Sequence, residues 1–200
     1  LVSGGICGAI DAVKEFAESI VNLAEETEED RILQAKLSGS AESFGYSVDF
    51  AKNQYKEFYE YLGDEQMSTN AITNLLGMQV ATDTVSESAE AAIAVWTAYG
   101  DSIPIESLTE SMNETAQVGK VTGVLADALN WAGISEDNFN TKLQALTTTQ
   151  ERADLIAQTL NDTYGQSKAT YDDMTEGIRN ANSAEAEFQE IQAEVGEAVE

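Results

Sequence analysis

The stretch from Val95 to Tyr164 decides the fold class, and it reads VWTAYGDSIPIESLTESMNETAQVGKVTGVLADALNWAGISEDNFNTKLQALTTTQERADLIAQTLNDTY. Its apolar residues recur at spacings of three and four, which is the period of one face of an α-helix. Gly and Ser fall between the apolar runs, and the single proline, Pro104, stands where the first turn of a helix tolerates a missing N–H. The stretch therefore predicts short helices joined by tight turns.

The rest of the chain follows the same pattern. Ala, Glu, Leu and Gln, which are good helix formers, dominate, and the period-two alternation of strands is nearly absent. We therefore expect an all-α fold, a multi-helix bundle or an array of short helices, with a long C-terminal helix that resembles a coiled coil. The expected helices span 8–24, 27–37, 47–62, 68–80, 86–99, 105–117, 120–131, 135–146 and 150–164, followed by the long helix after Tyr171.

Glycines mark the expected ends of several helices. Gly39 and Gly45 are expected to bracket a short connection, and Gly165 is expected to end the helix that starts at Gln150. We divide the chain into helical regions at 1–100 and 101–166 and a long helix at 167–200, with one compact domain as the alternative. Because the chain starts at Leu1 and ends within a helical pattern, we expect a fragment of a longer protein.

The last twenty residues carry a heptad pattern, with apolar residues spaced alternately three and four apart. The seam consists of Ala181, Ala184, Phe188, Ile191, Val195 and Ala198. One interpretation is self-association of the chain through this seam. The other is an ordinary amphipathic helix packed on its own domain, and two to three heptads do not separate the two.

The net charge of the chain limits the classes of molecule that it can bind. With 36 acidic and 10 basic residues, the net charge is −26. Nucleic-acid affinity comes mainly from Lys and Arg that neutralise phosphates, so binding to DNA, RNA or an anionic membrane surface is disfavoured. No stretch approaches the roughly 20 apolar residues that span a bilayer.

The sequence offers no catalytic, cofactor-binding or metal-binding residues, and we expect no enzyme and no cofactor. It contains no histidine, and Cys7 is its single cysteine, without a basic neighbour that would lower the thiol pKa. Carboxylates gather at 25–30, at Asp172-Asp173 and at Glu185, Glu187 and Glu190. Because no Gly-rich loop or nucleophile motif accompanies them, we interpret them as solvated helix faces.

The large aromatic residues fall on apolar faces of the predicted helices. Trp96, Tyr99, Trp131 and Tyr164 are the examples in the central stretch. An exposed docking patch is one interpretation, because aromatic residues often anchor interfaces. Their helical spacing favours packing in the core, and for Trp131 we expect a buried ring.

Five longer phrases stand in a fixed order along the chain. They are FGYSVDFAKNQYKEFYEYLGDEQM at 44–67, WTAYGDSIP at 96–104, NETAQ at 113–117, LADALNW at 125–131 and QERADLI at 150–156. Together they resemble the tail tape measure proteins of long-tailed phages and prophages of Gram-positive bacteria. The similarity covers roughly residues 44–198.

The resemblance implies a structural function, namely tail assembly and the determination of tail length. Several copies of such a protein occupy the lumen of the tail tube, so the implied partners are further copies, the tail tube protein and tail assembly chaperones. The implied location is the virion tail, and the host cytoplasm during assembly. A competing hypothesis is an acidic helical binding module of a bacterial surface or secreted protein, and a helical enzyme is a third.

Overall fold

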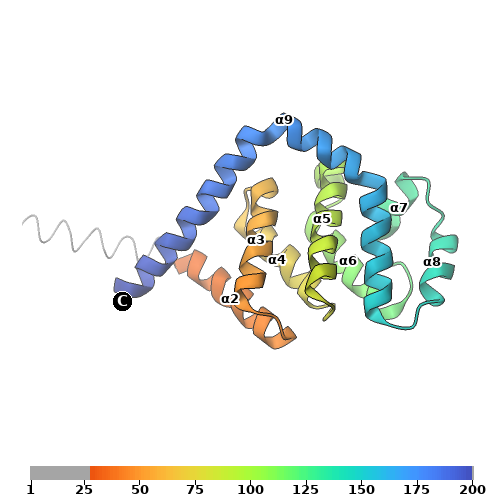
Figure 1. The fold of residues 1–200 in the computed structure, drawn as a ribbon, viewed down its shortest axis with the longest axis horizontal. Helices are drawn as coiled ribbons and strands as arrows, with labels where there is room; N and C mark the ends of the chain where they lie inside the picture. Colours follow the sequence, from red (N-terminus) through yellow and green to blue (C-terminus); the bar gives the residue numbers. More distant parts are fainter. Residues whose placement is uncertain (1–27, 200) are drawn as a thin grey trace, which may run out of the picture.

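The structure, a computed structural model, describes residues 28–199 of the 200-residue chain, with side chains for residues 31–193. All regular structure in these residues is helical, which confirms the all-α prediction (Figure 1). The helix expected at 8–24 lies outside the described residues. The elements are α2 (Glu28–Phe44), α3 (Val48–Leu62), α4 (Glu65–Leu76), α5 (Thr82–Tyr99), the 3-10 turn η1 (Gly100–Ser102), α6 (Ile105–Val118), α7 (Leu125–Trp131), α8 (Glu136–Gln144) and α9 (Thr149–Val199).

Helix α5 lies at the centre of the fold. It contacts α3, α4 and α6 and packs most extensively against α9. Four of its buried residues are alanines, whose small side chains let the neighbouring helices approach closely. One continuous core of buried side chains surrounds α5 and extends from Leu37 in α2 to Tyr164 in α9.

Helix α9 is 51 residues long and arches over the other helices, from α8 at one end to α2 at the other (Figure 1). The expected helix end at Gly165 is wrong, because the helix continues through this residue. A glycine inside a helix costs about 1 kcal/mol. Buried Tyr164 on one side of Gly165 and Tyr171 on the other, packed against Trp96 and Tyr61, anchor the helix on both sides and outweigh that cost.

Several predicted helix ends are confirmed with their caps. The Ser47 hydroxyl accepts a hydrogen bond from Phe50 N, 3.2 Å away, at the start of α3. Gly63 ends the same helix in the left-handed conformation, with φ at 59°. Ser135 caps α8, and Thr148 accepts a bond from the third residue on at the start of α9.

Other predicted ends are wrong. Gly39 lies inside α2, which continues to Phe44, and α4 starts earlier than expected because Asp64 caps it. The helix expected from Lys120 begins only at Leu125. Gly123 there has a φ of +51°, and a Cβ on it would lie 2.3 Å from the Ser111 hydroxyl. This close approach fixes a loop before α7.

Candidate interaction surfaces on helix α9

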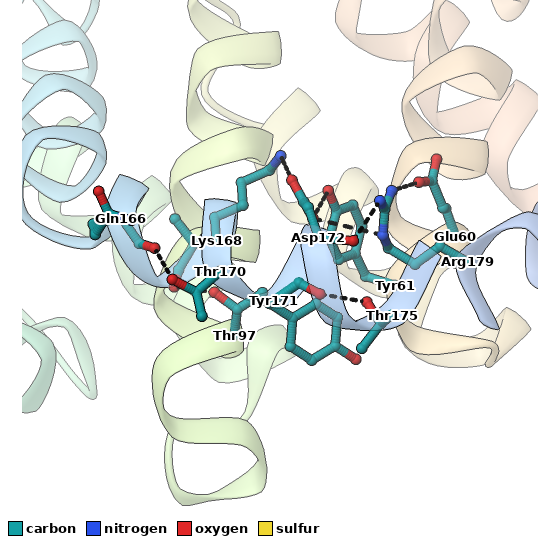
Figure 2. Close-up of polar contacts among 11 residues, drawn as sticks. Glu60, Tyr61, Thr97, Gln166, Lys168, Thr170, Tyr171, Asp172, Thr175 and Arg179 are labelled. Atoms are coloured by element: carbon teal, nitrogen blue, oxygen red, sulfur yellow. Dashed lines mark hydrogen bonds and ion pairs between the residues drawn. The ribbon is translucent and has the colours of Figure 1, made fainter. Parts of the chain in front are cut away.

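One side of α9 is fastened to α3 by a polar network around Tyr61. The Tyr61 hydroxyl donates to Asp172 Oδ1 at 2.8 Å, and Lys168 Nζ donates to Asp172 Oδ2 at 3.0 Å (Figure 2). Arg179 pairs with Glu60 of α3 and lies 3.6 Å from the Asp172 carboxylate. Lys168 and Arg179 also lie over the Tyr61 ring, at 5.2 and 5.3 Å from its centre. We call these five residues the polar clamp.

The clamp changes the proton affinity of its members. Burial alone would raise the pKa of the Asp172 carboxyl, but hydrogen bonds from Tyr61 and Lys168 and the charges of Lys168 and Arg179 hold it below its usual range. Burial raises the pKa of the Tyr61 hydroxyl. The pKa of Lys168 is raised despite its burial, because Tyr61 and Asp172 stabilise the ammonium form. At neutral pH the clamp therefore joins charged Asp172 to two charged bases.

A second attachment lies farther along α9. Glu190 accepts from Lys56 at 2.6 Å and from Lys52 at 3.1 Å, and both lysines belong to α3. The hydrogen bond from Lys56 lowers the pKa of the Glu190 carboxyl, and Lys52 adds to the effect. Asp172 and Glu190 were expected on solvated faces, and that expectation is wrong, because both bind bases at the α3–α9 contact.

The opposite side of α9 carries an exposed apolar stripe. The exposed fractions are 81% for Met174, 63% for Ile178, 53% for Phe188 and 58% for Ile191. The described members of the predicted seam, Ala181, Ala184, Phe188 and Ile191, are all exposed, while Val195 and Ala198 lie outside the described side chains. The side that packs on the domain carries Ala186 and Ala193 instead. We call the outer stripe the seam, and the structure extends it back to Met174.

A groove lies beside the start of the seam, between the C-terminal end of α5 and α9. It has a volume of about 880 Å³, and all of its lining side chains are uncharged. We call it the neutral groove, and the residues that define it are Thr97, Tyr99, Tyr164, Thr170, Tyr171 and Met174. Figure 2 shows Tyr171 next to Thr97 of α5, on the other side of the α9 ribbon from Lys168.

Aromatic rings pack edge-on beside this groove. Tyr99 contacts Trp131 edge-on at 5.0 Å and Tyr164 at 5.5 Å between ring centres. Tyr164 is buried as expected, and its hydroxyl donates to the carbonyl of Ala128, but Trp131 is 52% exposed. The prediction of a buried Trp131 is wrong. Helix α7 turns Leu125, Ala128 and Leu129 inward, and Trp131 is its last residue, at the edge of that face.

A different side of α9 borders an acidic depression. Glu87, Glu90, Asp154, Asp162 and Asp172 line it together with Lys168. Among the residues that the structure describes, no group of three or more His, Cys, Asp or Glu is placed to hold a metal ion. In the same part of the chain, no helix is both long and apolar enough to cross a membrane.

The polar clamp, the seam and the neutral groove all lie along α9, and the sequence indicated only some of them. The heptad spacing pointed to the seam, whereas the clamp joins residues 111 positions apart and leaves no local signal. The neutral groove was visible only as aromatic residues assigned to the core.

In comparisons with known proteins, the chain matches no family model, no curated protein and no solved structure.

Proposed function

We propose that this chain is part of a tail tape measure protein, a structural and non-enzymatic component that contributes to tail assembly and tail length. The observation that carries the proposal is α9, a 51-residue helix with one side fastened to the domain and the other carrying an apolar seam. At about 1.5 Å per residue, its contour is about 77 Å. Such a helix converts chain length into distance, which is what the sequence resemblance implies.

Copies of the chain would associate through the seam. Met174, Ala181, Phe188 and Val195 are seven residues apart and form one row of a heptad repeat. Ala184, Ile191 and Ala198 form the second row, three residues after members of the first. The domain does not block this contact, because α2 and α3 lie against the other side of α9.

The charges beside the seam favour a parallel pair in register. In that arrangement each residue just before a first-row position faces a residue five positions later in the partner helix. The facing pairs are Asp173 with Ile178, Asn180 with Glu185, and Glu187 with Gln192. None of these pairs joins two acids, although the chain carries a net charge of −26. A parallel pair therefore escapes the repulsion that such an acidic helix would otherwise meet.

By the same proposal, the remaining partners are the tail tube protein and tail assembly chaperones, in the tail lumen and in the host cytoplasm during assembly. The test uses the phage or prophage that encodes the chain. Four extra copies of the two-heptad unit 174–187, 56 residues in all, are inserted in frame after residue 187. Tails seen by electron microscopy are then expected to lengthen by about 84 Å, at ~1.5 Å per helical residue.

A matched insert with glutamate at every seam position separates pairing from length alone, and it is expected to give few complete tails. Unchanged tail length with the first insert would contradict the proposal.

A second candidate function, an acidic helical binding module of a bacterial surface or secreted protein, is favoured by the neutral groove and half-exposed Trp131. Antibody labelling of the chain on intact cells, with none on tails, would support that alternative instead.

A further inference from the structure

The neutral groove has an unusual chemistry for this surface. Charged residues make up 23% of the chain, yet none lines the groove, which instead carries three tyrosines, a methionine and several hydroxyl groups. A charge carried by a partner would lose water there without gaining an opposite charge. The part of a partner that enters the groove must therefore be apolar or neutral.

The hydroxyl groups of the groove are largely occupied. Thr97 donates to Ala94 O at 2.8 Å, Thr170 to Gln166 O at 3.0 Å and Thr175 to Tyr171 O at 2.7 Å. The Tyr164 hydroxyl is engaged with a carbonyl of α7 and with Tyr99. A lining whose hydroxyl donors are already engaged suits apolar side chains better than a sugar, which needs paired donors and acceptors.

Because these hydroxyl groups are already engaged, the groove also restricts the backbone conformation that a bound partner can have. An extended peptide in the groove would bury N–H and C=O groups that need hydrogen-bond partners. The described part of the chain has no strand whose edge would supply them. An α-helix satisfies its backbone groups internally, so it can lay an apolar face into a groove between two helices.

Charge decides which kind of helix fits. The surface around the groove belongs to a chain with a net charge of −26, and four of its ten bases are used in the α3–α9 attachments. An acidic helix would be repelled as it approached the groove. A partner with Lys and Arg beside its apolar face would be attracted.

We infer that the neutral groove is a docking site for a basic amphipathic α-helix of another protein, with apolar side chains placed against Tyr99, Tyr171 and Met174. Trp131 contacts Tyr99 at the edge of the groove and is half exposed. A docked helix would cover its ring. The groove shares Met174 with the seam but none of its other residues, so this contact stands or falls independently of the tape measure function.

The test uses the 200-residue chain and a fluorescein-labelled, tryptophan-free peptide of 18 leucine and lysine residues, with the leucines on one helical face. A peptide of the same composition, with the leucines scattered, measures attraction by charge alone. The patterned peptide is expected to shift the Trp131 emission to shorter wavelength and to bind at least tenfold more tightly by fluorescence anisotropy. The Trp131→Phe variant should lose the emission shift while it still binds the peptide.

Two variants with the same change of charge locate the site. Thr170→Lys places a cation in the groove and is expected to raise the Kd at least tenfold. Ile191→Lys places the same cation on the seam, and its Kd should stay within twofold of the original. Both positions are exposed helix positions, and circular dichroism checks that both variants fold.

Other outcomes overturn the inference. Equal weakening by the two variants would mean attraction by charge without a site, and stronger weakening by Ile191→Lys would move the contact to the seam. If Thr170→Lys abolished dimerisation of the chain and left peptide binding intact, the occupant would be a second copy. Equal affinity for the patterned and scattered peptides would also refute a docked helix.

Discussion

Replacing Phe188 and Ile191 with glutamate should abolish self-association without unfolding the domain. These side chains are 53% and 58% exposed, and a large apolar side chain has roughly 150–250 Å² of surface. Each therefore has roughly 100 Å² left to bury, which is about 2.5 kcal/mol at ~25 cal/mol per Å². Two residues in each of two chains give about 10 kcal/mol.

Association itself costs an estimated 4–15 kcal/mol in lost motion. The balance predicts weak association, with a dissociation constant of about 40 μM or higher. The association should strengthen as salt screens the acidic surface. The double variant loses the apolar contribution and adds four charges to the contact. Its free energy of unfolding should change by less than about 1 kcal/mol, because both positions are already mostly exposed.

Sedimentation velocity over a concentration series, at 0.15 and 1 M NaCl, measures the association, and thermal unfolding checks the fold. Gln158→Glu, on another exposed face of α9, is the control and should associate like the original chain at high salt. A chain that stays strictly monomeric at high concentration and high salt would refute the reasoning. So would a double variant that still associates.

The orientation of the pair has its own test within the same experiment. In a parallel pair Gln192 faces Glu187 of the partner, so Gln192→Lys should strengthen association and Gln192→Glu should weaken it. In an antiparallel pair, Glu187 instead faces Glu187 of the partner, or another residue that directly precedes a first-row position. Gln192 then no longer faces Glu187 of the partner. Equal association of the lysine and glutamate variants would therefore contradict the parallel arrangement.

Three further predictions concern the monomer, each checked by chemical or thermal unfolding. Trp131→Ala should cost less than about 1.5 kcal/mol, whereas Leu129→Ala, fully buried beside it, should cost about 2–5 kcal/mol; equal losses would place the Trp131 ring in the core. Gly165→Ala should stabilise by about 0.5–1 kcal/mol, because the helix is continuous there and a Cβ meets open space; a loss would mean that α9 needs glycine to bend. Folding lowers the pKa values of Asp172 and Glu190, so the two carboxylates stabilise the folded state fully above about pH 5. This stabilisation is lost as the pH falls through the lowered pKa values. The double change to Asn and Gln should therefore flatten the fall in melting temperature between pH 5 and 3, and an unchanged slope would contradict this.

Local signals in the sequence were sufficient where the structure is decided locally. Ser47 and Ser135 each accept a hydrogen bond from a backbone N–H three residues later in the chain. Gly63 adopts the left-handed conformation, which is unfavourable for residues with a Cβ atom. Such features depend on a few neighbouring residues, so the printed sequence contains them in full. The all-α class follows from the same kind of information, because helical spacing repeats along the chain.

The errors arise where distant contacts decide. Gly165 looks like a helix end until Tyr164 and Tyr171 are seen to hold the helix on both sides. Asp172 looks like a solvated acid until Tyr61, 111 residues earlier, donates to it. Trp131 has the right spacing for the core, but spacing does not reveal that α7 is only seven residues long and that the ring lies at its edge.

The distribution of charge on α9 connects these surfaces. Lys168 and Arg179 on α9, and Lys52 and Lys56 on α3, are used to fasten the helix to the domain. Placing those bases inward leaves the outer surface strongly acidic, so any contact with another molecule must either attract bases or avoid charge. The seam and the neutral groove are where α9 offers uncharged surface. We therefore expect partners to meet this helix at those two places, a second copy along the seam and a basic helix in the groove.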